Sequence, residues 1–429
     1  MKFISEKNMD RVLVVADKIA NFRYLKGISD GLASLLSITI VGSIFLLLGN
    51  LPINGYSELL AKLGLDQVLP FAYNCSVGLI AVYGTFFIAQ RFAQTFDIEG
   101  SIAGLLSLVA FFIVTPSVAS EDFNGYAFTW LGAQGLFVAI IISLLMSRIY
   151  VFIIQKDFVI KMPDGVPPTV SRSFAAIIPA FVIITLSLVI KGVFAMTSFT
   201  SIHHFVYQFI QTPLEHIGGS FAGIMVAILV MQILWVMGIH GSLIVYNIMT
   251  PIFLSLDTAN LTAFSNGEAL PNIVGGAFMN MFAELGGAGC TIGLNLLMLF
   301  MARSQRYKTL GRLAIVPSIG RINEPIVFGT PLVMNPIMAI PFIVAPLACA
   351  TFGYVTISLG IFPRLIGASV PMGIPVVIQG LLQGSWKLAV LHILCIIIAT
   401  LIYLPFFRIL DKQAYEEENN IQPAEEGTY

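Results

Sequence analysis

Hydrophobic residues fill long stretches of this chain, and short polar segments separate them. In the first half, uninterrupted apolar runs lie at about 28–49, 71–94, 100–119, 131–154 and 174–197. A helix of roughly 20 apolar residues crosses the hydrocarbon core of a bilayer, and repeated stretches of this length are typical of a helical membrane protein. The pattern predicts an all-α polytopic membrane protein.

The polar segments differ in charge, which predicts how the chain crosses the membrane. Residues 1–27 are basic, and their apolar positions recur at helical spacing, as expected of an amphipathic segment on the membrane surface. The segment 148–172 is also basic. Because basic loops favour the cytoplasmic side, both segments are predicted there, in agreement with four crossings between them.

The second half has shorter and more interrupted apolar segments. The sequence GIHG divides apolar runs at about 220–238 and 242–256, and prolines interrupt the run after residue 320. Non-helical backbone at membrane depth is tolerated where it faces protein or a water-filled cavity. We therefore expect about ten transmembrane helices with two re-entrant hairpins and interfacial amphipathic helices, and the functional site in the second half.

This pattern divides the chain into four parts. A cytoplasmic amphipathic segment at 1–27 precedes a helical bundle at 28–200, and a domain of broken helices follows at 201–410. Residues 411–429 are acidic and lack an apolar pattern, which predicts a disordered cytoplasmic tail. The basic segment 303–312 is predicted on the cytoplasmic side.

Composition supports a membrane protein and disfavours other classes. Hydrophobic residues make up 57% of the chain and charged residues only 10%, whereas a soluble domain carries about 25% charged residues. The net charge of −1 and the absence of a long basic arm give no footprint for nucleic acid. The four cysteines stand singly, without a CxxC or Cys/His cluster, so we expect buried thiols and no metal site.

Polar residues inside apolar stretches are the candidates for chemistry, and the first lie in GRINEPIVFGTPLVMNPIMAIPF, residues 320–342. A carboxylate at bilayer depth is costly and persists where it is paired, hydrogen-bonded or functional. Glu324 is therefore a candidate site residue, and Asn323 beside it can donate and accept hydrogen bonds, as sugar hydroxyls require. The alternative is a solvated ion pair between Glu324 and Arg321 in a cytoplasmic loop.

A second group of candidates surrounds the sequence LWVMGIHGSLIVY. His240 lies between Gly238 and Gly241, which permit a sharp turn and close approach of a ligand; the alternative is a packing residue. Trp235 offers a broad apolar face for a pyranose, or else packs in the core. Glu284 precedes the glycines of ELGGAGCTIG. Three roles are open for it: binding substrate, pairing with a cation, or lying at a helix end.

Three motifs together resemble a known family. The segments GRINEPIVFGTPLVMNPIMAIPF, WVMGIHG and LGGAGCTIGL are similar to the membrane-embedded IIC component of the bacterial phosphoenolpyruvate-dependent sugar phosphotransferase system (PTS), in its lactose/cellobiose/N,N′-diacetylchitobiose branch. The resemblance implies a homodimer among the lipids of the bacterial cytoplasmic membrane, with both termini cytoplasmic. It also implies that 28–200 forms the dimer interface and that 201–410 holds the sugar.

The resemblance further implies the chemistry. A phosphocysteine on a separate IIB protein, supplied through IIA, donates its phosphoryl group to the C6 hydroxyl of a cellobiose-, lactose- or diacetylchitobiose-type disaccharide. Glu324 then binds this hydroxyl and accepts its proton while His240 orients it, or the two exchange roles. Arg321 neutralises the incoming phosphoryl group or holds Glu324 in place. No metal or nucleotide of the chain's own is expected.

One position departs from the family pattern. The chain has VPMGIP at 370–375 where relatives often have VPWTTP, so Met372 replaces a tryptophan expected near the sugar. Which disaccharide is taken up is therefore open. The expected role is the membrane subunit of a protein-phosphocysteine–sugar phosphotransferase, active only with a separate IIB protein; the alternative is a sugar carrier or sensor that acts without phosphorylation.

Overall fold

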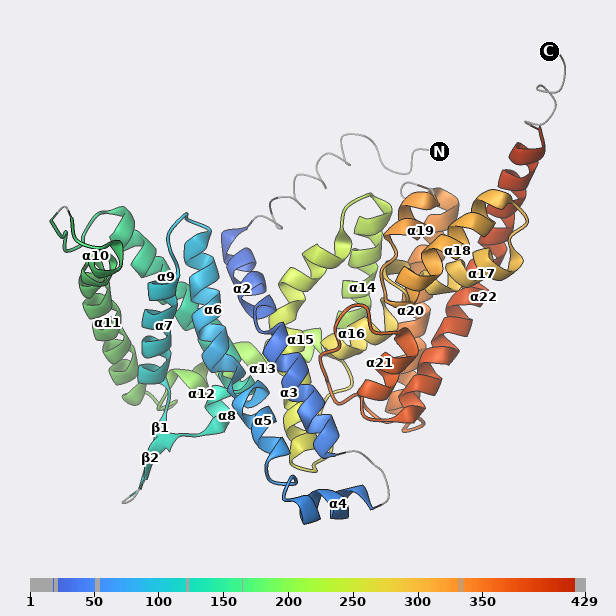
Figure 1. Ribbon diagram of the computed structural model, residues 1–429. Helices are drawn as coiled ribbons and strands as arrows, with labels where there is room; N and C mark the ends of the chain where they lie inside the picture. Colours follow the sequence, from blue (N-terminus) through green and yellow to red (C-terminus); the bar gives the residue numbers. More distant parts are fainter. Residues whose placement is uncertain are drawn as a thin grey trace. The chain divides into compact units, whose positions relative to one another are not determined.

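The computed structural model is built from helices (Figure 1), which confirms the predicted fold class. It describes residues 18, 22–50, 55–120, 123–163, 165–330, 332 and 335–420. Most of the predicted surface segment 1–27 and the acidic pair at 121–122 lie outside these residues. Within the described part of the chain, the strands are one antiparallel hairpin of β1 (Ser117–Ser120) and β2 (Phe123–Tyr126), in which Ser117 pairs with Tyr126.

The described chain forms two compact units that exchange segments. The amino-terminal unit contains 17–219 and 246–269, and the carboxy-terminal unit contains 220–245 and 270–429. The division after Val245 falls inside α15 (Gly241–Ser265). The units therefore differ from the predicted parts at 28–200 and 201–410, because the chain returns once to the amino-terminal unit after leaving it.

The amino-terminal unit is a bundle of membrane-length helices with short helices at their ends. Besides most of α15, its elements are α2 (Arg23–Ala33), α3 (Leu36–Gly49), α4 (Tyr56–Leu63), α5 (Leu69–Cys75), η1 (Val77–Leu79), α6 (Ile80–Gln94), α7 (Ser101–Val114), the hairpin, α8 (Phe128–Leu131), η2 (Ala133–Gly135), α9 (Leu136–Gln155), α10 (Pro168–Ala175), α11 (Ile177–Ala195), α12 (Ile202–Val206), η3 (Tyr207–Gln211) and α13 (Thr212–Gly218). Its core forms between α6, α7 and α9, where Phe111, Ile142 and Met146 are buried. Gly31 lets α2 lie directly against α6, since a Cβ there would come 2.5 Å from the Ile88 Cα atom.

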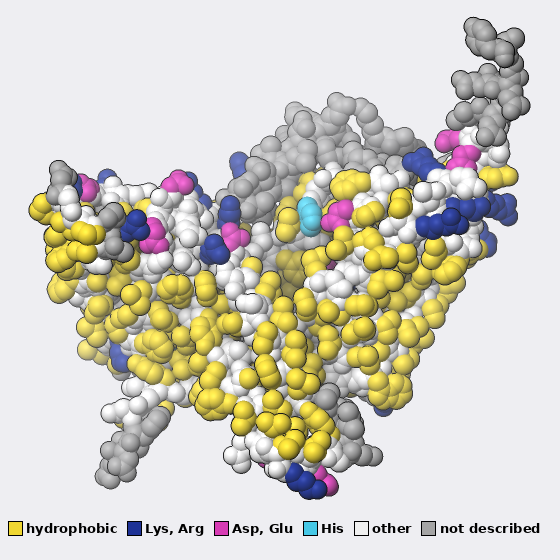
Figure 2. Space-filling model, viewed as in Figure 1, with side chains coloured by type: hydrophobic (Ala, Val, Ile, Leu, Met, Phe, Trp, Pro, Cys, Tyr) yellow, Lys and Arg dark blue, Asp and Glu magenta, His cyan; other side chains and the backbone are white. Residues whose placement is uncertain are grey.

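The carboxy-terminal unit consists of helices joined by irregular turns. Its elements are α14 (Phe221–Val236), the start of α15, α16 (Gly276–Phe282), η4 (Ala288–Cys290), α17 (Ile292–Met301), α18 (Gln305–Ile319), α19 (Glu324–Gly329), α20 (Pro336–Ser358), α21 (Val376–Leu382) and α22 (Trp386–Asn420). Helix α17 packs against α18 and α22, and α20 packs against α14 and α22. Figure 2 shows hydrophobic side chains over the flank of this unit and Lys and Arg gathered near α18 and the end of α22.

Among the described residues, seven helices are long and apolar enough to cross a membrane, or eight if the helical segments at 202–218 and 221–236 form one span. Four of the five runs predicted in the first half fall in spans of this set, and the fifth is the shorter apolar helix α7. The chain is thus a multi-pass membrane protein. The predicted total of about ten spans and the two re-entrant hairpins remain predictions.

The predicted disordered tail begins within a helix. Helix α22 continues to Asn420, and residues 421–429 lie outside the described chain. Two carboxylates hold this extension. Asp411 accepts hydrogen bonds from the backbone N–H groups of Arg303 and Ser304, at 2.8 and 3.1 Å. The Glu418 carboxylate accepts bonds from two N–H groups in the first turn of α18. Composition alone did not indicate these partners, because they lie more than a hundred positions away in sequence.

Three of the four cysteines meet inside the carboxy-terminal unit. Cys349 of α20 and Cys395 of α22 each donate to the other's carbonyl oxygen, at 3.3 and 3.9 Å. Cys290 of η4 lies close to Cys349, and its thiol donates to the Phe282 carbonyl oxygen at 3.3 Å. All three thiols are free and buried, which confirms the prediction for them, although their spacing in sequence did not suggest a cluster. Cys75 is exposed, so the prediction of a buried thiol is wrong there.

Candidate functional site

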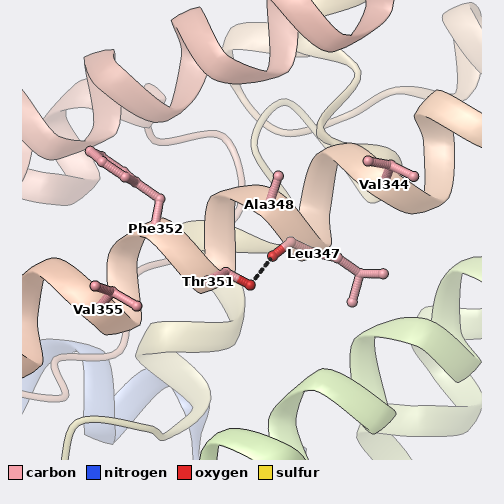
Figure 3. A pocket seen from close by; sticks show the side chains of 6 residues that line it. All are labelled: Val344, Leu347, Ala348, Thr351, Phe352 and Val355. Atoms are coloured by element: carbon pink, nitrogen blue, oxygen red, sulfur yellow. Dashed lines mark hydrogen bonds between the residues drawn. The ribbon is translucent and has the colours of Figure 1, made fainter.

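A large hollow on α20 is a poor candidate for a polar ligand. It has a volume of about 560 Å³ and is lined by six residues of this helix, five of them apolar: Val344, Leu347, Ala348, Thr351, Phe352 and Val355 (Figure 3). The Thr351 hydroxyl donates to the Leu347 carbonyl oxygen at 2.7 Å, so its proton is already used within the helix. Such a surface suits hydrocarbon, and the polar candidates lie elsewhere.

The GIHG sequence forms the predicted sharp turn between α14 and α15. Gly238 has φ of +82°, which favours glycine. A Cβ on Gly241 would lie 2.0 Å from the Met231 carbonyl oxygen, so only glycine fits there. His240 is exposed, and its Nδ1 accepts a hydrogen bond from the Leu243 N–H at 3.3 Å, which places the ring at the start of α15.

A hydrogen-bonded chain connects this turn to Glu284. The His240 ring lies against Trp235, with ring centroids 4.3 Å apart. Trp235 is only 7% exposed, and its Nε1–H donates to the Ser242 hydroxyl at 3.1 Å. That hydroxyl in turn donates to the Glu284 carboxylate at 2.8 Å. Because Trp235 is buried, the structure favours packing in the core over stacking on a sugar for most of its ring. Glu284, which follows α16, accepts a hydrogen bond from Ser242.

The glycine cluster after Glu284 forms a turn with left-handed backbone. Gly286, Gly287 and Gly289 have φ values of +71°, +100° and +77°. A Cβ on Gly287 would lie 2.4 Å from the side-chain Cγ of Asn323. The turn therefore requires glycine both for its conformation and for the close approach of the NEP segment.

Asn323 joins the NEP segment to this turn. Its side chain is buried, and its Nδ2 donates to the Ala288 carbonyl oxygen at 2.7 Å and to the Thr291 hydroxyl at 3.0 Å. Its backbone carbonyl oxygen accepts hydrogen bonds from the N–H groups of Ile326 and Val327 in α19, both at 2.9 Å. Glu324 begins α19 and is exposed. Glu324 thus lies in the first turn of a helix, where the helix dipole favours a carboxylate.

Arg321 is buried rather than solvated, so the structure disfavours the solvated ion pair. Its guanidinium donates to the Asn280 side-chain oxygen at 3.4 Å and to the carbonyl oxygens of Val370 and Pro371 at 3.2 and 3.0 Å. The Gly373 N–H also donates to the Gly320 carbonyl oxygen at 3.0 Å. The NEP segment is thereby fixed beside the VPMG loop.

The structure places all seven predicted site residues in the carboxy-terminal unit. Hydrogen bonds through Ser242 join Trp235 to Glu284, and His240 meets this group through its ring contact with Trp235. A second hydrogen-bonded group contains Asn323, Arg321 and the loop of Met372, which is 70% exposed. Both groups meet at the turn 284–291. The exposed titratable side chains Glu324 and His240 thus belong to two segments that both contact the turn 284–291.

The residues that make these connections were not predicted from the sequence. Ser242, Thr291 and Asn280 supply hydroxyl and amide groups to the predicted candidates. The available signal was a polar residue directly after each glycine motif: Ser242 follows GIHG and Thr291 follows GGAGC. No comparable signal marks Asn280.

Comparison with known proteins assigns the chain to a protein family. The family model described as "Phosphotransferase system, EIIC" matches residues 29–346. The chain belongs to this family. It is therefore a sugar permease component of the PTS that works with IIB and IIA proteins, as the sequence motifs predicted.

Close relatives of this EIIC chain extend over almost its entire length. The cellobiose-specific EIIC component of Geobacillus stearothermophilus is 41% identical, covering 95% of this chain and 94% of the relative. The lichenan permease IIC component of Bacillus subtilis (strain 168) is 38% identical, covering 96% and 95%. Among solved structures, ChbC, the IIC component of the N,N′-diacetylchitobiose-specific system, matches with a TM-score of 0.90 and 39% identity, covering 95% of this chain and 98% of ChbC.

Proposed function

We propose that this EIIC protein binds a β-linked disaccharide with glucose configuration, cellobiose first, translocates it across the cytoplasmic membrane and presents its C6 hydroxyl to phospho-IIB. Support comes from the family, from relatives named for cellobiose, lichenan and diacetylchitobiose at 38–41% identity, and from the arrangement of the polar residues. The observation that carries the proposal is the shared turn 284–291, which supports both His240 and Glu324.

The relatives favour one group of sugars over another. The lactose-specific EIICB components are 28–29% identical to this chain, well below the cellobiose- and chitobiose-type relatives. Cellobiose and diacetylchitobiose share an equatorial C4 hydroxyl on the sugar that is phosphorylated, whereas lactose has an axial one. We therefore expect lactose to bind more weakly than cellobiose.

Phosphoryl transfer requires a proton acceptor near the C6 hydroxyl. In the proposed step the phosphorus–sulfur bond of phosphocysteine breaks, and the oxygen–phosphorus bond to O6 forms. The cysteine leaves as a thiolate on IIB, and the O6 proton passes to Glu324, with His240 orienting the hydroxyl, or the reverse. Because phosphoryl transfer depends mainly on positioning, the contribution of this chain is a fixed geometry for both groups.

The buried candidates then act through position. Asn323 holds the NEP segment on the glycine turn through its side-chain Nδ2, and its side-chain Oδ1 is the atom proposed to accept from a sugar hydroxyl. Trp235 supports the His240 ring. Glu284 links the two groups of residues. Arg321 holds the loop of Met372, whose exposed thioether gives the sugar an apolar neighbour in place of an indole.

The remaining parts of the proposal concern the assembly. The chain acts without a metal or nucleotide of its own, because the phosphoryl group arrives from phosphoenolpyruvate through IIA and IIB. It works as a homodimer with both termini in the cytoplasm. Basic segments such as 148–172 and 303–312 support this orientation.

The test begins with equilibrium binding of labelled cellobiose, diacetylchitobiose, lactose and maltose to purified protein. We expect cellobiose or diacetylchitobiose to bind wild type, and Glu324→Gln and His240→Ala to lose at least about tenfold in affinity, or about 1.4 kcal/mol. Maltose, which is α-linked, is the control sugar. Unchanged affinity in both variants would show that neither side chain is needed to bind the sugar.

Phosphorylation is then measured separately from binding. Proteoliposomes that contain wild-type protein receive labelled disaccharide outside and phospho-IIB inside. Appearance of the sugar 6-phosphate inside supports the proposal, whereas uptake of unmodified sugar would indicate a carrier. Binding without either uptake or counterflow would indicate a sensor. A variant that binds sugar normally and still phosphorylates it would remove that residue from the proposed step.

A further inference from the structure

A basic hollow lies in the carboxy-terminal unit where the connection from α17 to α18 passes the end of α22. It has a volume of about 400 Å³ and is lined by eight residues: Met301, Arg303, Leu404, Phe407, Arg408, Asp411, Lys412 and Tyr415. None of these residues belongs to the sugar site described above. Figure 2 shows Lys and Arg side chains gathered in this part of the unit.

The lining changes from apolar to basic along one face of α22. Leu404, Arg408, Lys412 and Tyr415 follow one another at intervals of four, four and three residues, so they share a side of the helix. Met301 lies across from them at the end of α17, and it is 47% exposed. An apolar floor followed by cations and a tyrosine is the arrangement expected where hydrocarbon meets lipid headgroups.

The cations of the hollow are available to a ligand. The guanidinium groups of Arg303 and Arg408 make no hydrogen bond or ion pair with any of the described residues. Lys412 lies 3.7 Å from the Glu416 carboxylate, and both side chains are more than half exposed, so this pair is weak.

The acids around the hollow are largely occupied. Asp411 is buried and accepts three hydrogen bonds, from the N–H groups of Arg303 and Ser304 and from the Ser304 hydroxyl. Glu418 accepts two bonds from the first turn of α18. Both carboxylates thus bind backbone N–H groups at the start of α18. The guanidinium groups of Arg303 and Arg408 line the hollow without an acidic partner in the described part of the chain.

We propose that this hollow binds the headgroup of an anionic phospholipid. Arg303 and Arg408 pair with the phosphate oxygens, Lys412 adds a third charge, and the acyl chains continue along Met301 and Leu404. Guanidinium groups bind phosphate in a bidentate manner, and basic pockets at the ends of membrane helices bind anionic headgroups. A soluble phosphate would satisfy the cations but would leave the apolar floor uncovered, so the combination favours a lipid.

At a specific lipid site, the affinity for the lipid depends on which cations are removed and not only on how many. Cations near the ends of spans interact with anionic membranes wherever they lie. Lys308 and Arg312 belong to the same basic segment, but they do not line the hollow. They provide a matched control, because their removal lowers the charge of this region by the same amount.

The experiment compares lipid binding to the full chain by native mass spectrometry in detergent. Wild type, Arg303→Gln/Arg408→Gln and Lys308→Gln/Arg312→Gln are titrated with phosphatidylglycerol and with phosphatidylcholine. We expect one phosphatidylglycerol to bind wild type selectively, the first variant to lose about ten- to thirtyfold in affinity, and the control to change less than about threefold. A rise in melting temperature on addition of phosphatidylglycerol, absent in the first variant, gives a second readout.

Three outcomes would overturn the proposal. Equal loss in both double variants would show a general effect of charge. Equal binding of phosphatidylcholine would show that the headgroup charge is not recognised. Full displacement of phosphatidylglycerol by millimolar inorganic phosphate would assign the site to a soluble anion. Sugar binding is measured on the same samples, so failure of this site and failure of the proposed function remain distinct.

Discussion

At the scale of single residues, exposure separates the candidates into two kinds. His240 and Glu324 are exposed and carry the acid–base groups, whereas Asn323, Arg321 and Trp235 are buried and bonded to the backbone or to other side chains. The sequence could indicate all of them, because polar groups in apolar segments require a partner or a role. It could not assign the roles, since the partners Ser242 and Thr291 become neighbours only in the fold.

The hydroxyl of Ser242 connects Trp235 to Glu284, so its removal should disturb the support of His240. We expect Ser242→Ala to lower sugar affinity about five- to tenfold, because a buried Trp235 N–H loses its acceptor at about 1–3 kcal/mol. Ser242→Thr keeps the hydroxyl and should restore most of the affinity. Isothermal titration with the preferred sugar measures both. Equal affinities for Ser242→Ala and wild type would contradict the positioning role.

Asn323 holds the NEP segment on the glycine turn through two buried hydrogen bonds. Asn323→Ala should lower the free energy of unfolding by about 2–3 kcal/mol, because the Ala288 carbonyl and Thr291 hydroxyl lose their donor. The neighbouring Ile322 is 41% exposed, and Ile322→Ala should cost no more than about 0.5 kcal/mol. Denaturant unfolding of the detergent-solubilised protein compares the two. A smaller effect at Asn323 than at Ile322 would reject this account.

At the scale of elements, the hydrophobic spans were predictable and the polar helix starts were not. A run of apolar residues long enough to cross the bilayer is a local property, and the spans of the first half lie close to their predicted positions. Helix α18 begins in the basic segment 303–312, where no local apolar run indicated it. Its start depends on Ser304 and on carboxylates of α22, which are distant in sequence.

The glycine turn offers a test of backbone conformation separate from packing. Gly287 and Gly360 both have positive φ, +100° and +73°. A Cβ on Gly287 would collide with Asn323, whereas a Cβ on Gly360 would meet nothing within 4 Å. Gly360→Ala should therefore cost about 1 kcal/mol from conformation alone, and Gly287→Ala should cost at least about 3 kcal/mol and abolish sugar binding. Thermal unfolding and sugar binding of both variants provide the measurement; similar losses would show that the collision is relieved.

The start of α18 should depend on one carboxylate of α22. Glu418 accepts hydrogen bonds from the N–H groups of Gln305 and Arg306, both at 2.9 Å, and Glu417 beside it is exposed. We expect Glu418→Ala to lower the free energy of unfolding by about 1 kcal/mol, as for loss of a helix cap, and Glu417→Ala to change it little. Hydrogen exchange at residues 305–308 should rise in the first variant alone. Unchanged exchange there would show that Ser304 suffices as the cap.

At the scale of the whole molecule, the chain builds its two units from interleaved segments. The predicted boundary at residue 200 is a single cut, but residues 246–269 return to the amino-terminal unit. Hydropathy describes each span alone and gives no information on which spans pack together. The convergence of Cys290, Cys349 and Cys395 has the same origin, since three helices that are far apart in sequence bring them together.

The amino-terminal unit contains the helix best suited to contact a second copy. Only 17% of the apolar 18-residue stretch within the span at 170–195 is buried within the chain, the lowest share among the membrane-length helices of the described residues. Val189 and Val193 lie one turn apart on α11 and are 54% and 56% exposed. Ile393 and Ile397 of α22 have the same spacing and similar exposure, 45% and 49%. The two pairs therefore form a matched test of the predicted dimer interface.

We expect wild type to have the mass of two chains in detergent, measured by light scattering after gel filtration. Val189→Trp/Val193→Trp should weaken the dimer at least about tenfold, because membrane helices associate through close packing that large rings prevent. Ile393→Trp/Ile397→Trp should leave it intact, since lipid accommodates rings on an outer face. A monomeric wild type would reject the homodimer, and an equally stable dimer in both variants would place its interface on another surface.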